Sequence, residues 1–241
     1  AFALPLAFFW IKGAIPAGYK PRLVFLLALG GMQGVFGWFM VRSGLSGEMT
    51  DVSHFWLSIH LLTALLTLAA LTWTALDFKG MAATPPVQPP RLTRLGAVVG
   101  LILFVQLLLG AWVAGLNAGL ASDTWPLMQG RIFPEVDWSR GIGWAFTHEP
   151  YLLHFLHRWW AWIAVAALVL LARACKRAAA RPASIAIHST FGTQIVLGIA
   201  TVLTGVSLWL AVLHQLVGAL LVIAAAWGAH AIGARAGGKR A

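Results

Sequence analysis

The sequence predicts an all-α membrane protein, on three observations. Of its 241 residues, 60% are hydrophobic and only 10% are charged, whereas a soluble domain has about a quarter charged residues. Uncharged stretches long enough to cross a bilayer, about 17–25 residues, recur along the chain. The charged residues gather between these stretches. A soluble enzyme, a disordered tail and, with Cys175 as the one cysteine, a disulfide scaffold are therefore excluded.

Six complete membrane helices and one partial helix are expected. The uncharged segments are residues 23–41, 54–76, 95–122 and 182–234, and residues 151–172 contain only Arg158 as a charge. Residues 182–234 are too long for one crossing at about 1.5 Å per residue, so we expect a break at residues 204–207. Residues 1–11 are too short to cross. Because the chain starts with Ala inside this apolar run, we expect the end of a truncated span there.

Charge separates the connections into two sets. Alternate connections hold 13 of the 17 basic residues, and the other set holds six of the seven acidic residues. The positive-inside rule makes the basic set and the C-terminus cytoplasmic. This accounts for the net charge of +10, so the membrane lipid and not nucleic acid is the expected partner. We expect an N-terminal bundle (1–83), a cytoplasmic linker (84–94) and a C-terminal bundle (95–241) with an outer loop (119–150).

A short pattern, Gln-x-x-apolar-Gly, occurs in three spans: Gln33–Gly37, Gln106–Gly110 and Gln194–Gly198. Two copies continue in parallel, each with a Gly eleven residues after the Gln and then a helix with an early histidine, His60 or His214. Small residues also serve simple helix packing, but the joint match predicts two related helical bundles. By the same spacing, the first-half counterpart of His157 falls just upstream of residue 1.

Three histidines, His60, His157 and His214, are expected near the outer ends of their helices. Ionisable side chains in a membrane are costly and usually face the bundle interior. Neutral imidazoles from two facing helices can hold a heme iron from both sides, which suits His157 and His214. Arg158 would then meet a heme propionate. The alternative is that these are hydrogen-bonded core histidines.

The other histidines receive weaker assignments. His154 shares a helix face with His157, but a zinc site lacks a third ligand. His54 and His148 are expected at the membrane interface. We assign no role to His188 or His230.

Taken together, the motifs resemble the heme A synthase family, of the mitochondrial and alphaproteobacterial type. The resemblance spans nearly the whole chain. The matching segments are Leu4-Pro5 with Phe8-Phe9, residues 30–38, residues 40–45, Val52-Ser53, His60-Leu61, residues 106–110, residues 114–120, residues 124–128, His157-Arg158, residues 194–201 and His214-Gln215.

The resemblance implies two four-helix bundles that bind heme near the outer face of a bacterial inner membrane. His157 and His214 would ligate heme b in the C-terminal bundle, and His60 would ligate the iron of the substrate heme O. The partner of His60 and a candidate catalytic glutamate would lie upstream of residue 1. Members of this family oxidise a ring methyl of heme O to a formyl group by successive hydroxylations, which gives heme A.

The same resemblance implies a heme O synthase as donor and a terminal oxidase as recipient. The electron acceptor and homo-oligomerisation stay open. Two departures concern the heme environments, because the family usually has Arg at Trp56 and often has Gln at His154. A bis-histidine cytochrome b that only transfers electrons is the main alternative. A transporter ranks last, because no charge is expected at the membrane midplane.

Overall fold

The computed structural model describes residues 2–44, 51–83 and 89–238. Helices make up most of this part of the chain, which contains no β-strand beyond an isolated bridge between Met128 and Arg131. The helices are α1 (Ala3–Ile11), α2 (Lys20–Gly44), α3 (His54–Ala83), α4 (Arg94–Gly115), the 3₁₀ helix η1 (Ala118–Ala121), α5 (Ile142–His148), α6 (Pro150–Arg177), α7 (Arg181–Leu203) and α8 (Leu208–Gly238).

Six of these helices, α2, α3, α4, α6, α7 and α8, are long and apolar enough to cross a membrane. The prediction of an all-α, multi-pass membrane protein is therefore confirmed. The predicted break at residues 204–207 is also confirmed, since α7 ends at Leu203 and α8 begins at Leu208. Gly205 has φ +60° in this turn, a left-handed conformation that glycine adopts without steric cost.

Two predicted spans have the wrong boundaries. The segment 95–122 is not one helix: α4 ends at Gly115, and Asn117 (φ +52°) turns the chain before η1. The segment 54–76 ends too early, because α3 continues to Ala83 and includes the charged Asp77. Sequence reasoning ended this span at the first charge, whereas a buried partner network allows the helix to carry Asp77 inside (described below).

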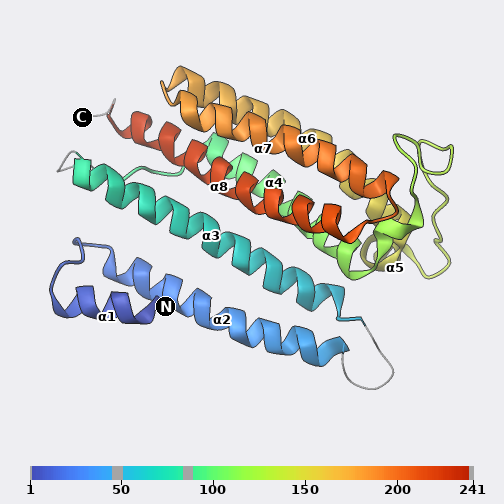
Figure 1. Ribbon diagram of the computed structural model, residues 1–241, viewed down its shortest axis with the longest axis horizontal. Helices are drawn as coiled ribbons and strands as arrows, with labels where there is room; N and C mark the ends of the chain where they lie inside the picture. The colour runs from blue at the N-terminus through green and yellow to red at the C-terminus, as the bar shows by residue number, and fades with distance from the viewer. Residues whose placement is uncertain (1, 45–50, 84–88, 239–241) are drawn as a thin grey trace.

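The long helices lie side by side along one axis of the molecule (Figure 1). Helix α2 packs on α3, while α6 contacts α4, α7 and α8. The long helices thus form two groups, α2 with α3, and α4 with α6, α7 and α8. Helix α3 also packs on α4 and α8 and so joins the two groups. The α1–α2 connection and the C-terminal end of α8 lie at one end of the molecule; α5 and the α7–α8 turn lie at the other. Successive long helices therefore run in opposite directions, which brings the basic connections to one end of the molecule and the acidic connections to the other.

A buried apolar core lies among α4, α6, α7 and α8. Val99, Leu168, Leu171, Cys175 and Ile187 are nearly inaccessible to solvent and form part of this core. By contrast, many large apolar side chains remain exposed on the outside of the helices, among them Leu101, Leu170, Val196 and Trp209. Exposed apolar helix faces of this kind are what a lipid environment stabilises.

Candidate functional site

Each copy of the Gln-x-x-x-Gly pattern faces a histidine on the next membrane helix. Gly37 of α2 faces His60 of α3, Gly110 of α4 faces His157 of α6, and Gly198 of α7 faces His214 of α8. A Cβ atom added at the three glycines would lie 3.4, 2.9 and 3.0 Å, respectively, from the Cε1 atom of the facing ring. The glycines therefore make room for the imidazole rings.

The glutamine of each pattern contacts the same histidine. Gln106 Nε2 lies 3.1 Å from His157 Nδ1 and donates a hydrogen bond to the His157 carbonyl oxygen at 3.2 Å. Gln194 Nε2 lies 3.2 Å from His214 Nε2. With its amide turned to satisfy both of its ends, Gln33 donates to the His60 carbonyl oxygen at 3.1 Å and lies 3.2 Å from His60 Nδ1. The pattern thus does more than let two helices approach.

The three histidines occupy similar positions along their helices. They follow the first residues of α3, α6 and α8 by six, seven and six positions, which is about 9–11 Å along each helix. All three are half-buried. The helices that carry His157 and His214, α6 and α8, contact each other. Sequence reasoning had no means of pairing either histidine with its glutamine partner.

Arg158, the predicted partner of an anionic group, connects α6 to the outer segment, which comprises residues 119–150. Its Nε atom donates to His154 Nε2 at 2.9 Å, and its Nη1 and Nη2 atoms donate to the carbonyl oxygens of Thr124 (2.7 Å) and Ser122 (3.0 Å). Arg158 also lines a hollow of about 260 Å³. The other lining residues are Trp125, Pro126, Trp159 and Trp162.

The two departures from the family pattern both find partners in the structure. His154 is buried and accepts the hydrogen bond from Arg158 described above. Trp56 stacks on Phe39 of α2, with ring centroids 4.7 Å apart and planes at 12°. Neither side chain disturbs the helix that carries it. Trp56 therefore places an aromatic side chain four residues before His60, where the family usually has an arginine.

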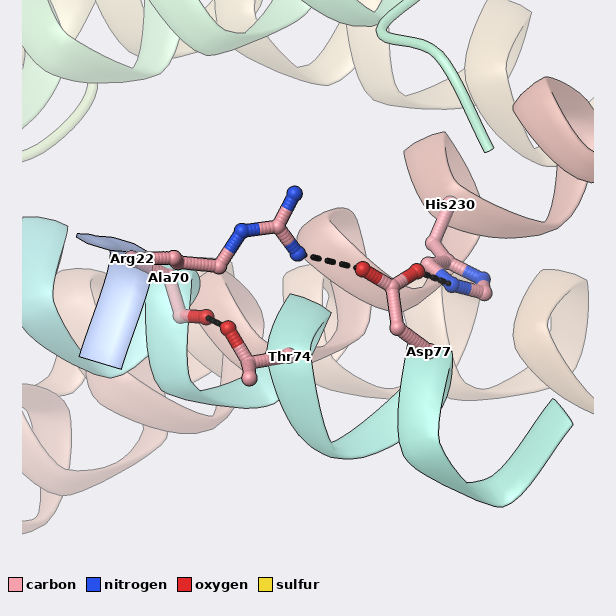
Figure 2. A network of polar contacts seen from close by, with 5 residues as sticks. All are labelled: Arg22, Ala70, Thr74, Asp77 and His230. Atoms are coloured by element: carbon pink, nitrogen blue, oxygen red, sulfur yellow. Dashed lines mark hydrogen bonds and ion pairs between the residues drawn. The ribbon is translucent and has the colours of Figure 1, made fainter. Parts of the chain in front are cut away.

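A polar network at the opposite end of the helices was not predicted from the sequence. Asp77 on α3 forms an ion pair with Arg22 of α2, and its other carboxylate oxygen lies within hydrogen-bonding distance, 2.9 Å, of Nε2 of His230 on α8 (Figure 2). The Asp77 side chain has no exposed surface. His230, which received no role from the sequence, is thus one of its two partners. The only sequence signal was that Asp77 stands apart from the other six acidic residues.

Tyr19, just before α2, lies beside this network. Burial, and next the nearby carboxylate of Asp77, raise the pKa of the Tyr19 hydroxyl above its usual value of 10.0. The Tyr19 ring also packs against Phe78, with centroids 5.0 Å apart. Residues from three helices and one connection therefore meet at Asp77.

The residues present around His157 and His214 fit a heme held between two helices. Such a group needs two neutral imidazoles from facing helices. Gly110 and Gly198 leave the space for these rings. The His214 Nδ1 atom is buried and has no hydrogen-bond partner among the described residues. A buried nitrogen without a partner is costly unless a ligand engages it.

The fold and the site define a multi-pass α-helical membrane protein in which histidines are held at similar positions along paired helices. The chain belongs to the cytochrome oxidase assembly protein family, whose model matches residues 1–226. A relative from Erythrobacter litoralis, named heme A synthase, is 62% identical over 97% of this chain and 69% of its own length.

Two further relatives carry the same name. The protein of Novosphingobium aromaticivorans is 53% identical over 97% of this chain and 68% of its own length. The protein of Sphingopyxis alaskensis is 52% identical over 98% of this chain and 66% of its own length. The similarity thus covers both groups of helices, and the chain spans about two thirds of each relative.

Proposed function

We propose that this protein oxidises heme O to heme A for terminal oxidases, the activity for which its relatives are named. One observation carries the proposal: three histidines occupy similar positions along their helices, each held by a glutamine and a glycine of the neighbouring helix. This arrangement occurs in a chain that is 62% identical to a heme A synthase. Oxidation of a methyl to a formyl group makes the reaction an oxidoreduction.

The two groups of helices would bind different hemes. In the C-terminal bundle (95–241), His157 and His214 would hold heme b. In the N-terminal bundle (1–83), with 84–94 as the linker between them, His60 would ligate the iron of the substrate heme O. Heme b supplies a one-electron redox centre when bound. The protein's own contribution is to hold and orient the rings and to keep water from the half-buried imidazoles.

Arg158, which directly follows His157, would pair with a propionate of the heme. Its guanidinium lies beside the hollow that Trp125 and Trp159 line, and an arginine pairs well with a carboxylate such as a propionate. Its contacts to Ser122 and Thr124 would couple that pocket to the outer segment (119–150).

The proposed setting is a bacterial inner membrane with the C-terminus in the cytoplasm and the hemes near the outer face. The basic connections lie at the end of the molecule opposite the three histidines, as the positive-inside rule requires for this orientation. A heme O synthase would supply the substrate, and a terminal oxidase would receive the product.

The test is the heme content of the protein. The full chain is expressed in membranes that supply heme O and is then purified, and its hemes are extracted and identified by mass. We expect heme b together with heme A or a hydroxylated heme O. Heme b alone would indicate a cytochrome that only transfers electrons, and a protein free of heme would refute the proposal.

The histidine assignments have their own test. His157→Ala and His214→Ala should each lose heme b, because one of its two iron ligands is gone. His60→Ala should keep heme b and lose the heme A product. His188→Ala is the matched control, since among the described residues its ring has one hydrogen-bond partner, the Ser184 carbonyl oxygen of the same helix at 2.8 Å. Retention of heme b in both His157→Ala and His214→Ala would show that the assignment is wrong.

A further inference from the structure

We propose that the Gln-x-x-x-Gly pattern is a positioning device for the heme-ligating histidines. The glycine admits the ring, and the glutamine fixes its rotation. The inference rests on the proposed function, because it takes His157 and His214 as ligands. The glutamines and glycines act through the histidines and are positioning residues.

The steric half of the device is graded among the three copies. A Cβ atom at Gly110 would lie 2.9 Å from His157 Cε1 and 3.4 Å from its Nδ1, so the ring would have to move. At Gly198 the corresponding distance to His214 Cε1 is 3.0 Å. At Gly37 the distance to His60 Cε1 is 3.4 Å, an ordinary van der Waals contact. Alanine should therefore be harmful at Gly110 and Gly198 and nearly neutral at Gly37.

The polar half depends on the glutamine carboxamides. In Gln106 and Gln194 the amide nitrogen reaches the histidine ring, and the Oε1 atom is buried without a partner among the described residues. A buried polar group of this kind is costly in a core. A carboxamide can turn either its NH₂ group or its oxygen toward the ring. A neutral imidazole that binds iron through one nitrogen carries its proton on the other, so the carboxamide would support that N–H with its oxygen.

The same helices provide matched controls for the glycines. Gly100 on α4 and Gly192 on α7 have open space where a Cβ would stand, as does Gly34 on α2. Replacing glycine by alanine inside a helix raises helix propensity by a similar amount at each of these positions. This gain cancels when Gly110→Ala is compared with Gly100→Ala and Gly198→Ala with Gly192→Ala. What remains is the contact with the ring.

The experiment measures how the full chain binds heme b and how the bound heme behaves. Heme b is titrated into heme-free protein, and the electron paramagnetic resonance spectrum and midpoint potential of the ferric complex are recorded. Gly110→Ala and Gly198→Ala should bind heme b about 10–100-fold more weakly, with shifted spectra. Gly100→Ala and Gly192→Ala should match the wild type.

A second pair of variants keeps the test decisive if an alanine variant fails to fold. Gln106→Leu and Gln194→Leu keep the side-chain bulk and remove the ring contact, so they should shift the spectrum and the potential of bound heme b. The control is Gln129→Leu, since Gln129 lies in the outer segment and bonds the Ala121 carbonyl oxygen.

The outcomes separate the two proposals. A wild-type chain that binds no heme b would refute the proposed function. A wild-type chain that binds heme b, with Gly110→Ala and Gln106→Leu indistinguishable from it, would overturn the positioning role alone. Equal losses in Gly100→Ala and Gly110→Ala would also overturn it, because any added methyl group would then have the same effect.

Discussion

At the scale of single residues, Asp77 shows how a membrane helix can carry a charge inside. An ionised carboxylate without a partner is very unfavourable in an apolar environment. Asp77 meets Arg22 on one side and His230 on the other (Figure 2). The Arg22 side chain keeps 39% of its surface exposed, so water still solvates part of that charge. The network therefore links α2, α3 and α8 near the end opposite the histidine sites.

We expect Asp77→Asn to lower the free energy of unfolding by about 1–3 kcal/mol, because Arg22 loses its charged partner. The value is at the low end for a buried pair since Arg22 is partly exposed. Thermal or denaturant unfolding in detergent measures it. Asp137→Asn is the control, because the Asp137 carboxylate lies in the outer segment and bonds the Ser139 backbone N–H at 2.9 Å. Equal stabilities of the two variants would contradict the network's role.

The same variant should change the titration of Tyr19. Burial and the Asp77 charge raise the pKa of Tyr19 above 10.0, so the stability from its neutral form is intact below pH 10 and is lost as pH rises through the raised value. Removing the Asp77 charge should therefore lower the pKa of Tyr19. Absorbance titration, with Tyr19→Phe as reference, follows this change.

At the scale of elements, the start of α6 is strongly determined. Pro150 occupies the first turn, where its missing N–H costs nothing. Glu149, which is buried, caps the helix through a hydrogen bond from the Leu152 backbone N–H to its Oε2 at 2.6 Å. Its negative charge also suits the positive end of the helix dipole. The cap residue Glu149 lies eight residues before His157, so the start of α6 determines where the His157 ring stands along the helix.

We expect Glu149→Ala to destabilise the protein by about 0.5–2 kcal/mol, the usual cost of losing such a cap. The comparison is Glu135→Ala, since the Glu135 side chain is 79% exposed and pairs with Arg131, which is also exposed. Unfolding in detergent measures both variants. If Glu135→Ala costs as much as Glu149→Ala, the cap does not stabilise α6.

At the scale of the whole molecule, α3 and α4 join the two groups of helices. Trp112 of α4 donates a hydrogen bond to Ser58 of α3 at 3.2 Å. A Cβ at Gly115 would lie 2.7 Å from His54 Cβ and 2.8 Å from its Cα. Backbone and side chain are therefore in close contact here, and the buried His54 ring packs beside His148 with centroids 4.9 Å apart.

Gly115→Ala should force α3 and α4 apart and cost about 1–3 kcal/mol, as overpacking of a tight contact does. Gly100→Ala, on the same helix with open space around it, should leave stability unchanged or slightly raised. Thermal unfolding of the two variants in detergent tests this. A stable Gly115→Ala variant would show that the contact between α3 and α4 can adjust to an added methyl group.

Much of the fold follows from the sequence because lipid imposes a simple rule on it. Each helix must satisfy its own backbone hydrogen bonds and present apolar side chains over about 30 Å. The six spans and the break between α7 and α8 could therefore be predicted from hydropathy and a turn segment. The end of α3 could not, because hydropathy places a boundary at the charged Asp77, whose partners lie 55 and 153 residues away in the chain.

The sequence by itself determined the membrane class, the number of long helices and the placement of His60, His157 and His214 near the starts of their helices, since these depend on local composition and on spacing along each helix. Only the tertiary structure decided what the repeated glutamines and glycines do. Gln106 meets His157 from 51 residues away, and Gln194 meets His214 across a turn. Such contacts depend on which helix faces are packed together, and hydropathy carries no information about that choice.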